Sequence, residues 1–415
     1  MIRALSIFAV IYALISARRV PLIRLDRPTA ALAGAVLMVA AGVLTPEAAY
    51  RAIDWNTIAL LLGMFVLTGS LRLAGFFELA ATALLRRAES PRLLLVAITF
   101  SAGLLSALLV NDTVCVMFAP FVIMLVERSG IPIVPHLFGL AVGANVGSAM
   151  TVVGNPQNMV VAGAAPLTYA SFARVMAPAG LIALAVATAL LSMLFRRQLA
   201  VGGVRHVATS TPEVDRPLLI KTLACFIFTS VGFILGFQLA WTALAGAVIL
   251  IAVSGRQPRQ ILSEVNGPLL LFFGALFVVV GGLDRSGVLA DASAWVVASL
   301  QDGGVVGLLK FSLVSVLAAK VVSNVPWGVL AATWLPHGVG HEREWLTLAV
   351  TATFAGNLTL LGSVANVIVF EAARERCAIG FWRFLAIGAP ITVLTTAVGL
   401  VHGVGVDVRL DLFPP

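Results

Sequence analysis

The segment TVVGNPQN, residues 151–158, places polar and helix-breaking residues inside a long apolar run that extends over residues 135–163. The segment TLLGSVAN, residues 359–366, interrupts the apolar run 345–372 in the same way. The threonine, the glycine and the last asparagine of the two segments align at one offset of 208 residues (359 minus 151). Proline and glycine interrupt helical hydrogen bonding. Each segment therefore predicts a helix that is broken near its middle, and the chain contains this feature twice.

Composition places these breaks in a membrane. The chain has 415 residues, of which 60% are hydrophobic and 11% are charged. A soluble domain carries about 25% charged residues, so this chain has too little polar surface to dissolve in water. The net charge of +8 is spread over short loops between apolar segments, which argues against nucleic-acid binding. The sequence predicts a polytopic membrane protein whose solvent is the lipid bilayer.

The apolar segments form two sets of six, which indicates an internal repeat. We expect a first repeat at 1–195, a polar cytoplasmic linker at 196–216 and a second repeat at 217–415. Three further landmark pairs keep nearly the same offset: Asn111 with Asn324 (213), Gly75 with Gly287 (212) and Asn56 with Asn266 (210). Segments 76–90 and 284–300 have the pattern of amphipathic helices at the membrane surface.

The fourth apolar segment of each repeat, at 92–127 and 304–335, is longer than the roughly 20 residues that cross a bilayer, and its centre is polar. We expect each to be a re-entrant hairpin, with turns at Asn111-Asp112-Thr113 and Ser323-Asn324-Val325-Pro326. Each repeat then crosses five times, so the second is inverted relative to the first. The predicted fold class is an all-α inverted repeat of two five-helix halves, with about ten spans and two hairpins.

Basic residues predict the orientation. With the N-terminus outside, nineteen of the 27 Lys and Arg residues fall in inside loops, six fall outside, and two lie in the second hairpin. We therefore expect both termini to lie outside a bacterial inner membrane.

The breaks predict where the binding site lies. Non-helical backbone at membrane depth occurs only where it is buried in protein or lines a cavity. Broken helices in inverted repeats recur as ion and substrate sites at the bilayer midplane. The candidates form two clusters, Asn111, Thr113, Gly154, Asn155 and Asn158 in the first half, and Ser323, Asn324, Thr359, Gly362, Ser363 and Asn366 in the second. The alternative is that each polar side chain only caps a helix break or bonds across helices.

Two ionisable residues occur at the same depth, where charge is costly and usually functional. Asp112, at the first hairpin tip, is a candidate to carry a proton or to ligate a cation. Lys320, one turn before Asn324, is a candidate to bind an anionic substrate or to take the place of a cation in the second half. A structural ion pair between Asp112 and Lys320 is the alternative.

Four stretches carry a family resemblance: LLVNDTVCVMFAP (108–120), GANVGSAMTVVGNPQNMVV (143–161), KVVSNVPWGVLA (320–331) and FAGNLTLLGSVANVIVFE (354–371). They resemble the ion transporter superfamily, which includes divalent anion–sodium symporters, citrate transporters, arsenite efflux permeases and some sodium–proton antiporters. The resemblance covers nearly the whole chain. It implies a scaffold domain and a transport domain of hairpins and broken helices, an elevator-like motion and often a homodimer.

The resemblance also implies two Na⁺ sites. The first would use Asn111, Thr113, Asn155 and Asn158, and the second Ser323, Asn324, Gly362, Ser363 and Asn366. Dicarboxylate symporters of this group have Ser-Asn-Thr at both hairpin tips. Here the first tip has an added acid, Asp112, and the second lacks the threonine. These departures favour the arsenite-efflux and sodium–proton antiporter branch.

The sequence contains no P-loop, HExxH or GxSxG motif, so we expect neither an ATP-driven pump nor an enzyme, and no cofactor beyond a coupling ion, Na⁺ or H⁺. The leading prediction is a secondary active transporter for a small anion or inorganic ion. The alternatives are a sodium–proton antiporter and an uncoupled channel or non-transporting membrane protein.

Overall fold

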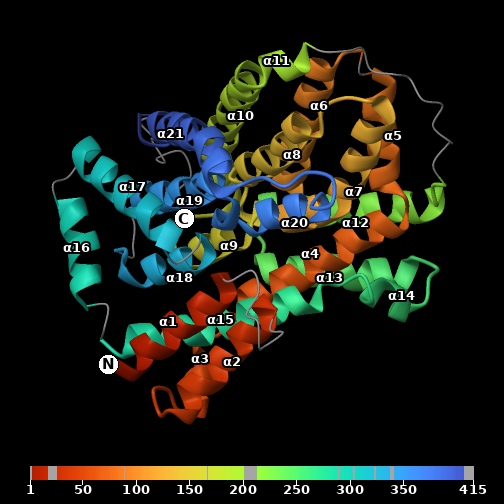
Figure 1. Ribbon diagram of the computed structural model, residues 1–415. Helices are drawn as coiled ribbons and strands as arrows, with labels where there is room; N and C mark the ends of the chain where they lie inside the picture. The colour runs from red at the N-terminus through yellow and green to blue at the C-terminus, as the bar shows by residue number, and fades with distance from the viewer. Residues whose placement is uncertain are drawn as a thin grey trace.

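The computed structural model of the chain describes residues 2–16, 26–87, 89–165, 167–200, 213–287, 290–301, 304–321, 324–336 and 341–405. Throughout these ranges the regular structure is α-helix with short 3₁₀ turns and no strand, which confirms the all-α class (Figure 1). Ser323, one of the candidate site residues, lies outside the described residues.

The first half contains the helices up to the linker. They are α1 (Ile2–Ser16), α2 (Arg27–Ala40), α3 (Pro46–Ala52), α4 (Trp55–Leu73), α5 (Phe76–Arg87), α6 (Pro91–Leu108), α7 (Asn111–Ser129), α8 (Ile133–Ser148), η1 (Val152–Gly154), α9 (Pro156–Ala164), α10 (Tyr169–Leu194) and α11 (Arg196–Leu199).

The second half follows the same order, from α12 to α21. Its elements are α12 (Arg216–Ile234), α13 (Leu239–Val253), α14 (Pro258–Leu262), α15 (Gly267–Arg285), α16 (Ala290–Gln301), α17 (Gly304–Val321), α18 (Asn324–Trp334), α19 (Glu342–Ala355), η2 (Gly356–Leu358), η3 (Leu360–Gly362), α20 (Val364–Ala372) and α21 (Phe381–Gly405).

Equivalent helices start at matching positions in the two halves. Trp55 and Gly267 begin α4 and α15, 212 residues apart (267 minus 55). The glycines that follow these helices, Gly75 and Gly287, both have left-handed backbone, with φ of 78° and 70°. Residues with a Cβ rarely adopt this conformation, so the glycine pair marks the same turn twice. One landmark was wrong: Asn266 caps α15 as Asp54 caps α4, so its counterpart is Asp54 and not Asn56.

The helices pack into two parts (Figure 1). Helices α1–α4 and α12–α15 form what we call the scaffold part, where α4 packs on α13 and α2 packs on α15. Helices α6–α10 and α17–α21 form the hairpin part, where α7 packs on α20, α9 packs on α18, and α10 packs on α21. Each contact between the halves therefore has a reciprocal partner, as expected for two copies of one unit.

Six of the described helices are long and apolar enough to cross a membrane: α4, α6, α10, α12, α15 and α21. Shorter apolar helices occur at α1, α2, α8 and α13. Large apolar side chains such as Ile227, Trp241 and Val248 are more than half exposed, which suits contact with lipid. The amphipathic helix expected at 284–300 begins later, because α15 continues through Arg285.

Both predicted breaks are present. In the first half α8 ends at Ser148, a single 3₁₀ turn follows, and α9 starts at Pro156, where the missing N–H costs no helical bond. In the second half η2 and η3 separate α19 from α20. Asn155 caps α9 by accepting a hydrogen bond from the Asn158 backbone N–H at 3.1 Å.

The hairpin tips differ in detail from expectation. The chain reverses at Leu109–Val110, so Asn111, Asp112 and Thr113 form the first turn of α7 and not the loop itself. Similarly, Asn324 is the first residue of α18. The Thr151 hydroxyl at the helix break donates to the Ala107 carbonyl near the hairpin tip. The tip and the break are therefore at one level.

Candidate functional site

The centre of the hairpin part is a network of buried amides around Asn145 on α8. The two N–H groups of the Asn145 amide donate to Oδ1 of Asn357 (3.0 Å) and to Oδ1 of Asn366 (2.9 Å). Its oxygen accepts from Nδ2 of Asn111 (3.4 Å) and from the Ser363 hydroxyl (2.8 Å). All four positions of this amide are used. The network connects the first hairpin tip to the second broken helix.

The break of the first half makes a related contact with α19. Thr353 is the repeat counterpart of Asn145 at the offset of 208 (353 minus 145). Its Oγ1 accepts from Asn155 Nδ2 at 3.2 Å and from Gln157 Nε2 at 2.5 Å. The candidate residues therefore do not form two separate clusters, because both breaks bond across the repeat. Asp112 lies at a different contact, where α7 packs on α20 and the Ala365 backbone N–H in the first turn of α20 is close to its carboxylate.

The last asparagines of the two segments hold the unwound backbone in the same way. The side chain of Asn158 donates to the carbonyls of Ser148 and Thr151, at 3.1 and 3.0 Å. The Asn366 amide donates to the carbonyls of Gly356 and Thr359, at 2.8 and 3.1 Å. These bonds satisfy the carbonyls that the breaks leave unpaired. Asn158 and Asn366 therefore do cap the helix breaks, as the alternative interpretation of the sequence stated.

Several buried polar atoms here have no hydrogen-bond partner in the protein. They include the side-chain oxygens Oγ1 of Thr113, Oε1 of Gln157 and Oδ1 of Asn158, and the Lys320 ammonium. Buried polar atoms in native proteins are nearly always bonded, so each of these atoms is a candidate to contact a ligand or a water molecule. Neutral hydroxyl and amide oxygens are suitable ligands for a hard monovalent cation. The three first-half oxygens are therefore suited to a Na⁺ ion, whereas the Lys320 ammonium is not.

A cavity of about 350 Å³ lies between the scaffold part and the hairpin part. Arg27 and Phe272 line it from the scaffold side, and Lys320, Asn324 and Thr359 line it from the hairpin side. Asp112, which is only 5% exposed, is not among the lining residues but lies within electrostatic reach of Arg27. The cavity thus presents two cationic side chains, and a buried carboxylate lies near one of them, Arg27.

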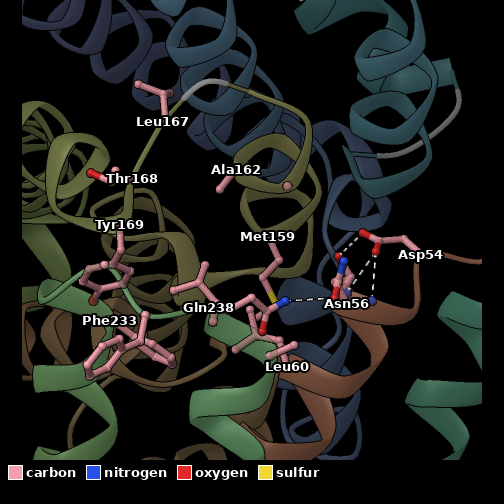
Figure 2. Close-up of a pocket in the computed structure, with 16 residues that line it drawn as sticks. Asp54, Asn56, Leu60, Met159, Ala162, Leu167, Thr168, Tyr169, Phe233 and Gln238 are labelled. Atoms are coloured by element: carbon pink, nitrogen blue, oxygen red, sulfur yellow. Dashed lines mark hydrogen bonds between the residues drawn. The ribbon is translucent and has the colours of Figure 1, made fainter. Parts of the chain in front are cut away.

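A second cavity, of about 330 Å³, occupies the matching place in the repeat (Figure 2). Its lining includes Leu60 and Tyr169, which are the counterparts of Phe272 and Phe381 in the first cavity at an offset of 212 (381 minus 169). In Figure 2 Asn56 accepts a 2.9 Å hydrogen bond from Gln238, and Tyr169 lies against Phe233. The acid lining this cavity, Asp54, caps α4 and is bonded to Thr57.

The charged groups break the repeat symmetry. The counterparts of Arg27, Asp112 and Lys320 in the other half are apolar: Leu239, Val325 and Ala107, at offsets of 212 (239 minus 27), 213 (325 minus 112) and 213 (320 minus 107). Arg27 and Lys320 therefore line only the first of the two equivalent cavities, and Asp112 lies within electrostatic reach of Arg27. Because of this asymmetry, the first cavity is the candidate substrate site.

The structure also decides the pairing of the two mid-membrane charges. The charged residue that faces Asp112 is Arg27, and no ion pair joins Asp112 to Lys320. The alternative of a structural Asp112–Lys320 pair is therefore not what the structure shows. Gly154 approaches the Ser148 carbonyl so closely that a Cβ would lie 2.1 Å from its oxygen, which explains the glycine.

Four residues of the candidate site were not predicted from the sequence: Asn145, Thr353, Asn357 and Arg27. A usable signal existed for Asn145 and Thr353, because they align at the same offset as the breaks and are polar within apolar helices. Arg27 follows the pattern of an inside-loop residue, and no local signal separates it from its neighbours.

Comparison with known proteins now places the chain. The profile of the citrate transporter family matches residues 11–355. The chain belongs to this family. Among relatives of this citrate transporter family member, the silicon efflux transporter LSI3 of Oryza sativa subsp. japonica is 30% identical, over 95% of this chain and 95% of its own. The uncharacterized transporter Rv2684 of Mycobacterium tuberculosis (strain ATCC 25618 / H37Rv) is 32% identical, over 96% of this chain and 97% of its own.

Among solved structures, the YdaH transporter of Alcanivorax borkumensis has the same fold, with a TM-score of 0.59. The match covers 99% of this chain and 97% of that one, at 18% identity. These findings confirm the resemblance to the ion transporter superfamily and its polytopic helical fold. This member of the citrate transporter family is an integral membrane protein of the transporter class, and its relatives support an ion or an anion as its substrate.

Proposed function

We propose that the protein is a secondary active transporter that moves a small anion or inorganic ion, coupled to H⁺ or Na⁺, by an elevator-like movement of the hairpin part against the scaffold part. The observation that carries the proposal is the cavity between these two parts, which Arg27 and Lys320 line. Binding there is made by both parts at once, so a shift of one against the other changes the site.

Arg27 supplies a coupling mechanism. The ionised Asp112 carboxylate attracts the Arg27 guanidinium, whereas a protonated Asp112 leaves it available to an anion in the cavity. Arg27 is partly exposed, so this competition between two anionic partners is worth about 1 kcal/mol, less than the several kcal/mol of a fully buried pair. The proton and the anion therefore bind together. This favours proton–anion symport over exchange of a proton for an anion.

The substrate class follows from the size and chemistry of the cavity. About 350 Å³ accommodates a small solute, and the lining offers two cations together with amide and hydroxyl groups. The relative LSI3 is named a silicon efflux transporter. We propose an oxygen-rich inorganic acid or its anion as the substrate.

A sodium–proton antiporter is the second candidate, because Asp112 is buried near unpaired oxygen atoms such as Thr113 Oγ1. In that case a cation would compete with the proton at Asp112. An uncoupled channel is the third, and it would conduct without a fixed ratio of proton to substrate.

Thermal stability of the purified protein separates these candidates. We would measure it with Na⁺, Li⁺, phosphate, sulfate, citrate, arsenite and silicic acid at two pH values. A ligand that binds the folded state raises the apparent stability by mass action. Stabilisation by one anion or acid, stronger at low pH, supports symport. Stabilisation by Na⁺ or Li⁺ alone, lost at low pH, supports the antiporter and removes the anion proposal.

The expected orientation, with both termini outside a bacterial inner membrane, would open the Arg27 cavity to the cytoplasm. Labelling of single cysteines introduced at Asp26 and at Gln238 tests it: the first would react only from inside and the second only from outside. A homodimer remains an expectation of the family resemblance, and cross-linking in the membrane tests it.

We expect Arg27→Gln to raise the KM for an anionic substrate by about 10- to 100-fold, because a hydrogen bond to a charged group is worth about 1.5–3 kcal/mol. Uptake into vesicles at a series of substrate concentrations measures this. Arg256→Gln, at an exposed surface ion pair with Asp215, is the matched control and should leave KM unchanged. An unchanged KM in Arg27→Gln would exclude Arg27 from the substrate site.

We expect Asn158→Ala to raise the Na⁺ concentration for half-maximal stabilisation about tenfold, which corresponds to about 1.4 kcal/mol, if Na⁺ is the coupling ion. The reason is that its Oδ1 is buried and unpaired. Asn366→Ala is a matched control, since it loses two equivalent backbone bonds but its Oδ1 already accepts from Asn145. If Asn158→Ala and Asn366→Ala changed the Na⁺ dependence equally, the unpaired Oδ1 of Asn158 would not be a specific Na⁺ ligand.

A further inference from the structure

The Lys320 ammonium lies next to the second helix break as well as at the wall of the cavity. Lys320 is the second-last residue of α17, and its Nζ is buried without a hydrogen-bond partner in the protein. A Cβ placed on Gly362 would lie 2.3 Å from this Nζ, 2.9 Å from the Gly356 carbonyl oxygen and 3.0 Å from Thr359 Oγ1. The ammonium therefore lies against Gly362 in the unwound backbone of the second helix break, in the same neighbourhood as the Gly356 carbonyl and the Thr359 hydroxyl but without a hydrogen bond to either.

The equivalent place in the first half is arranged differently. Ala107 stands where Lys320 stands, so α6 offers no ammonium group at this position. Gly154, the counterpart of Gly362, lies against the Ser148 carbonyl, with a Cβ-to-oxygen distance of 2.1 Å. The nearby Asn158 keeps its Oδ1 unpaired. The first break therefore presents oxygen atoms and has no lysine at the position that Lys320 takes in the second half.

In the second half, by contrast, protein donors already serve the acceptors. Oδ1 of Asn366 accepts from the Asn145 amide at 2.9 Å, whereas its counterpart on Asn158 has no donor. The difference has a simple origin in the sequence. Thr353, which replaces Asn145 in the repeat, has no N–H to offer and instead accepts from Asn155 and Gln157.

We propose that the Lys320 ammonium is a tethered cation that permanently occupies the ion position of the second half, so that the transporter binds its coupling cation in the first half only. The inference rests on the proposed function, since it concerns the ion sites of a coupled transporter. It has a direct consequence for stoichiometry, because one fixed charge replaces one exchangeable ion. The same ammonium reaches the cavity wall, where its positive charge also favours an anion.

The test compares two substitutions that differ in the space they leave. Lys320→Ala removes the charge and opens the position, and Lys320→Met removes the charge but keeps most of the volume. We expect Na⁺ or methylammonium to raise the thermal stability of Lys320→Ala further than that of the wild type, and to restore its transport. Neither ion should rescue Lys320→Met. Lys310→Ala, an exposed residue on the same helix, should behave as the wild type.

The site is isolated by repeating the stability measurement with Asn158→Ala present. The double variant Lys320→Ala/Asn158→Ala should be stabilised by Na⁺ at concentrations at which Asn158→Ala alone responds only weakly. If no small cation stabilises Lys320→Ala more than the wild type, the tethered-cation proposal is overturned, and Lys320 acts only as a substrate ligand. Cation binding is measured here as a change in thermal stability and not as a transport rate. A failed transport assay would therefore count against the proposed function, and this inference would still be decided.

Discussion

We expect Asp112→Asn to abolish proton-driven accumulation of substrate, lowering it by about 100-fold or more, while the protein still folds and inserts. The amide cannot take up or release a proton, and it is neutral at every pH. Arg27 would then face no competing anion, so the cavity would keep its affinity for an anionic substrate. The size of the effect is that typical of removing a positioned group that must exchange a proton in each cycle, about 10²- to 10⁴-fold.

The measurement uses proteoliposomes with an imposed pH gradient. Asp112→Asn should lose accumulation against a gradient but retain exchange of labelled for unlabelled substrate, because exchange requires no net proton movement. Glu371→Gln is a matched control, since this acid on α20 is exposed and pairs with Arg374 at the surface. Accumulation at the wild-type rate by a correctly inserted Asp112→Asn protein would remove Asp112 as the coupling group.

The retained exchange is the part of this result that separates mechanisms. In a sodium–proton antiporter Asp112 would ligate the transported cation itself, and Asp112→Asn would lose exchange together with accumulation. In the symport mechanism proposed here the carboxylate acts through Arg27 and does not touch the anion. One variant in two assays therefore tests both the residue and the way in which it acts.

The sequence predicted the helix breaks and hairpins well, because their signals are local. Pro156 and the glycines of the two segments interrupt apolar runs, and they recur at one offset. The exact turn of the first hairpin was not predicted, because the chain reverses at Leu109–Val110 and Leu109 adopts ordinary extended backbone, with φ of −118° and ψ of 161°. Such a turn needs neither glycine nor proline, so it leaves no mark in the sequence.

The partners of the site residues were harder to predict than the residues themselves. Asn145 lies in an uninterrupted helix whose periodicity is that of its apolar neighbours, and its four bonds come from three distant segments. Arg27 belongs to the scaffold part, and only the packing of that part against the hairpins brings it to Asp112. The repeat offset could have revealed Thr353. That Arg27, Asp112 and Lys320 have apolar counterparts in the repeat can be interpreted only after the structure has shown the two equivalent cavities.

We expect Asn145→Ala to destabilise the protein by about 2–4 kcal/mol and to abolish transport, the largest stability effect among the variants considered. The substitution deletes one amide and leaves the polar groups of Asn111, Asn357, Asn366 and Ser363 without their partner in a dry interior. Four losses come to about 2.4 kcal/mol at the average of about 0.6 kcal/mol for an interhelical hydrogen bond inside a membrane. They come to about 4 kcal/mol at about 1 kcal/mol each, the lower end of the cost of an unsatisfied buried group.

Reversible unfolding in mixed detergent micelles measures this change, with Thr353→Val as the matched control at the repeat counterpart. Thr353→Val keeps the shape of the side chain and removes the two hydrogen bonds that Thr353 accepts from amide side chains. Asn145→Ala removes four hydrogen bonds, so we expect about half of its destabilisation in Thr353→Val. Asn145 joins the first hairpin tip to the second broken helix, and Thr353 joins the first broken helix to α19. A stability loss that is no larger in Asn145→Ala than in Thr353→Val would show that the amide does not hold the two halves together. The coupling of Asp112 to the break beside it would then have to rest on α7 packing against α20 alone.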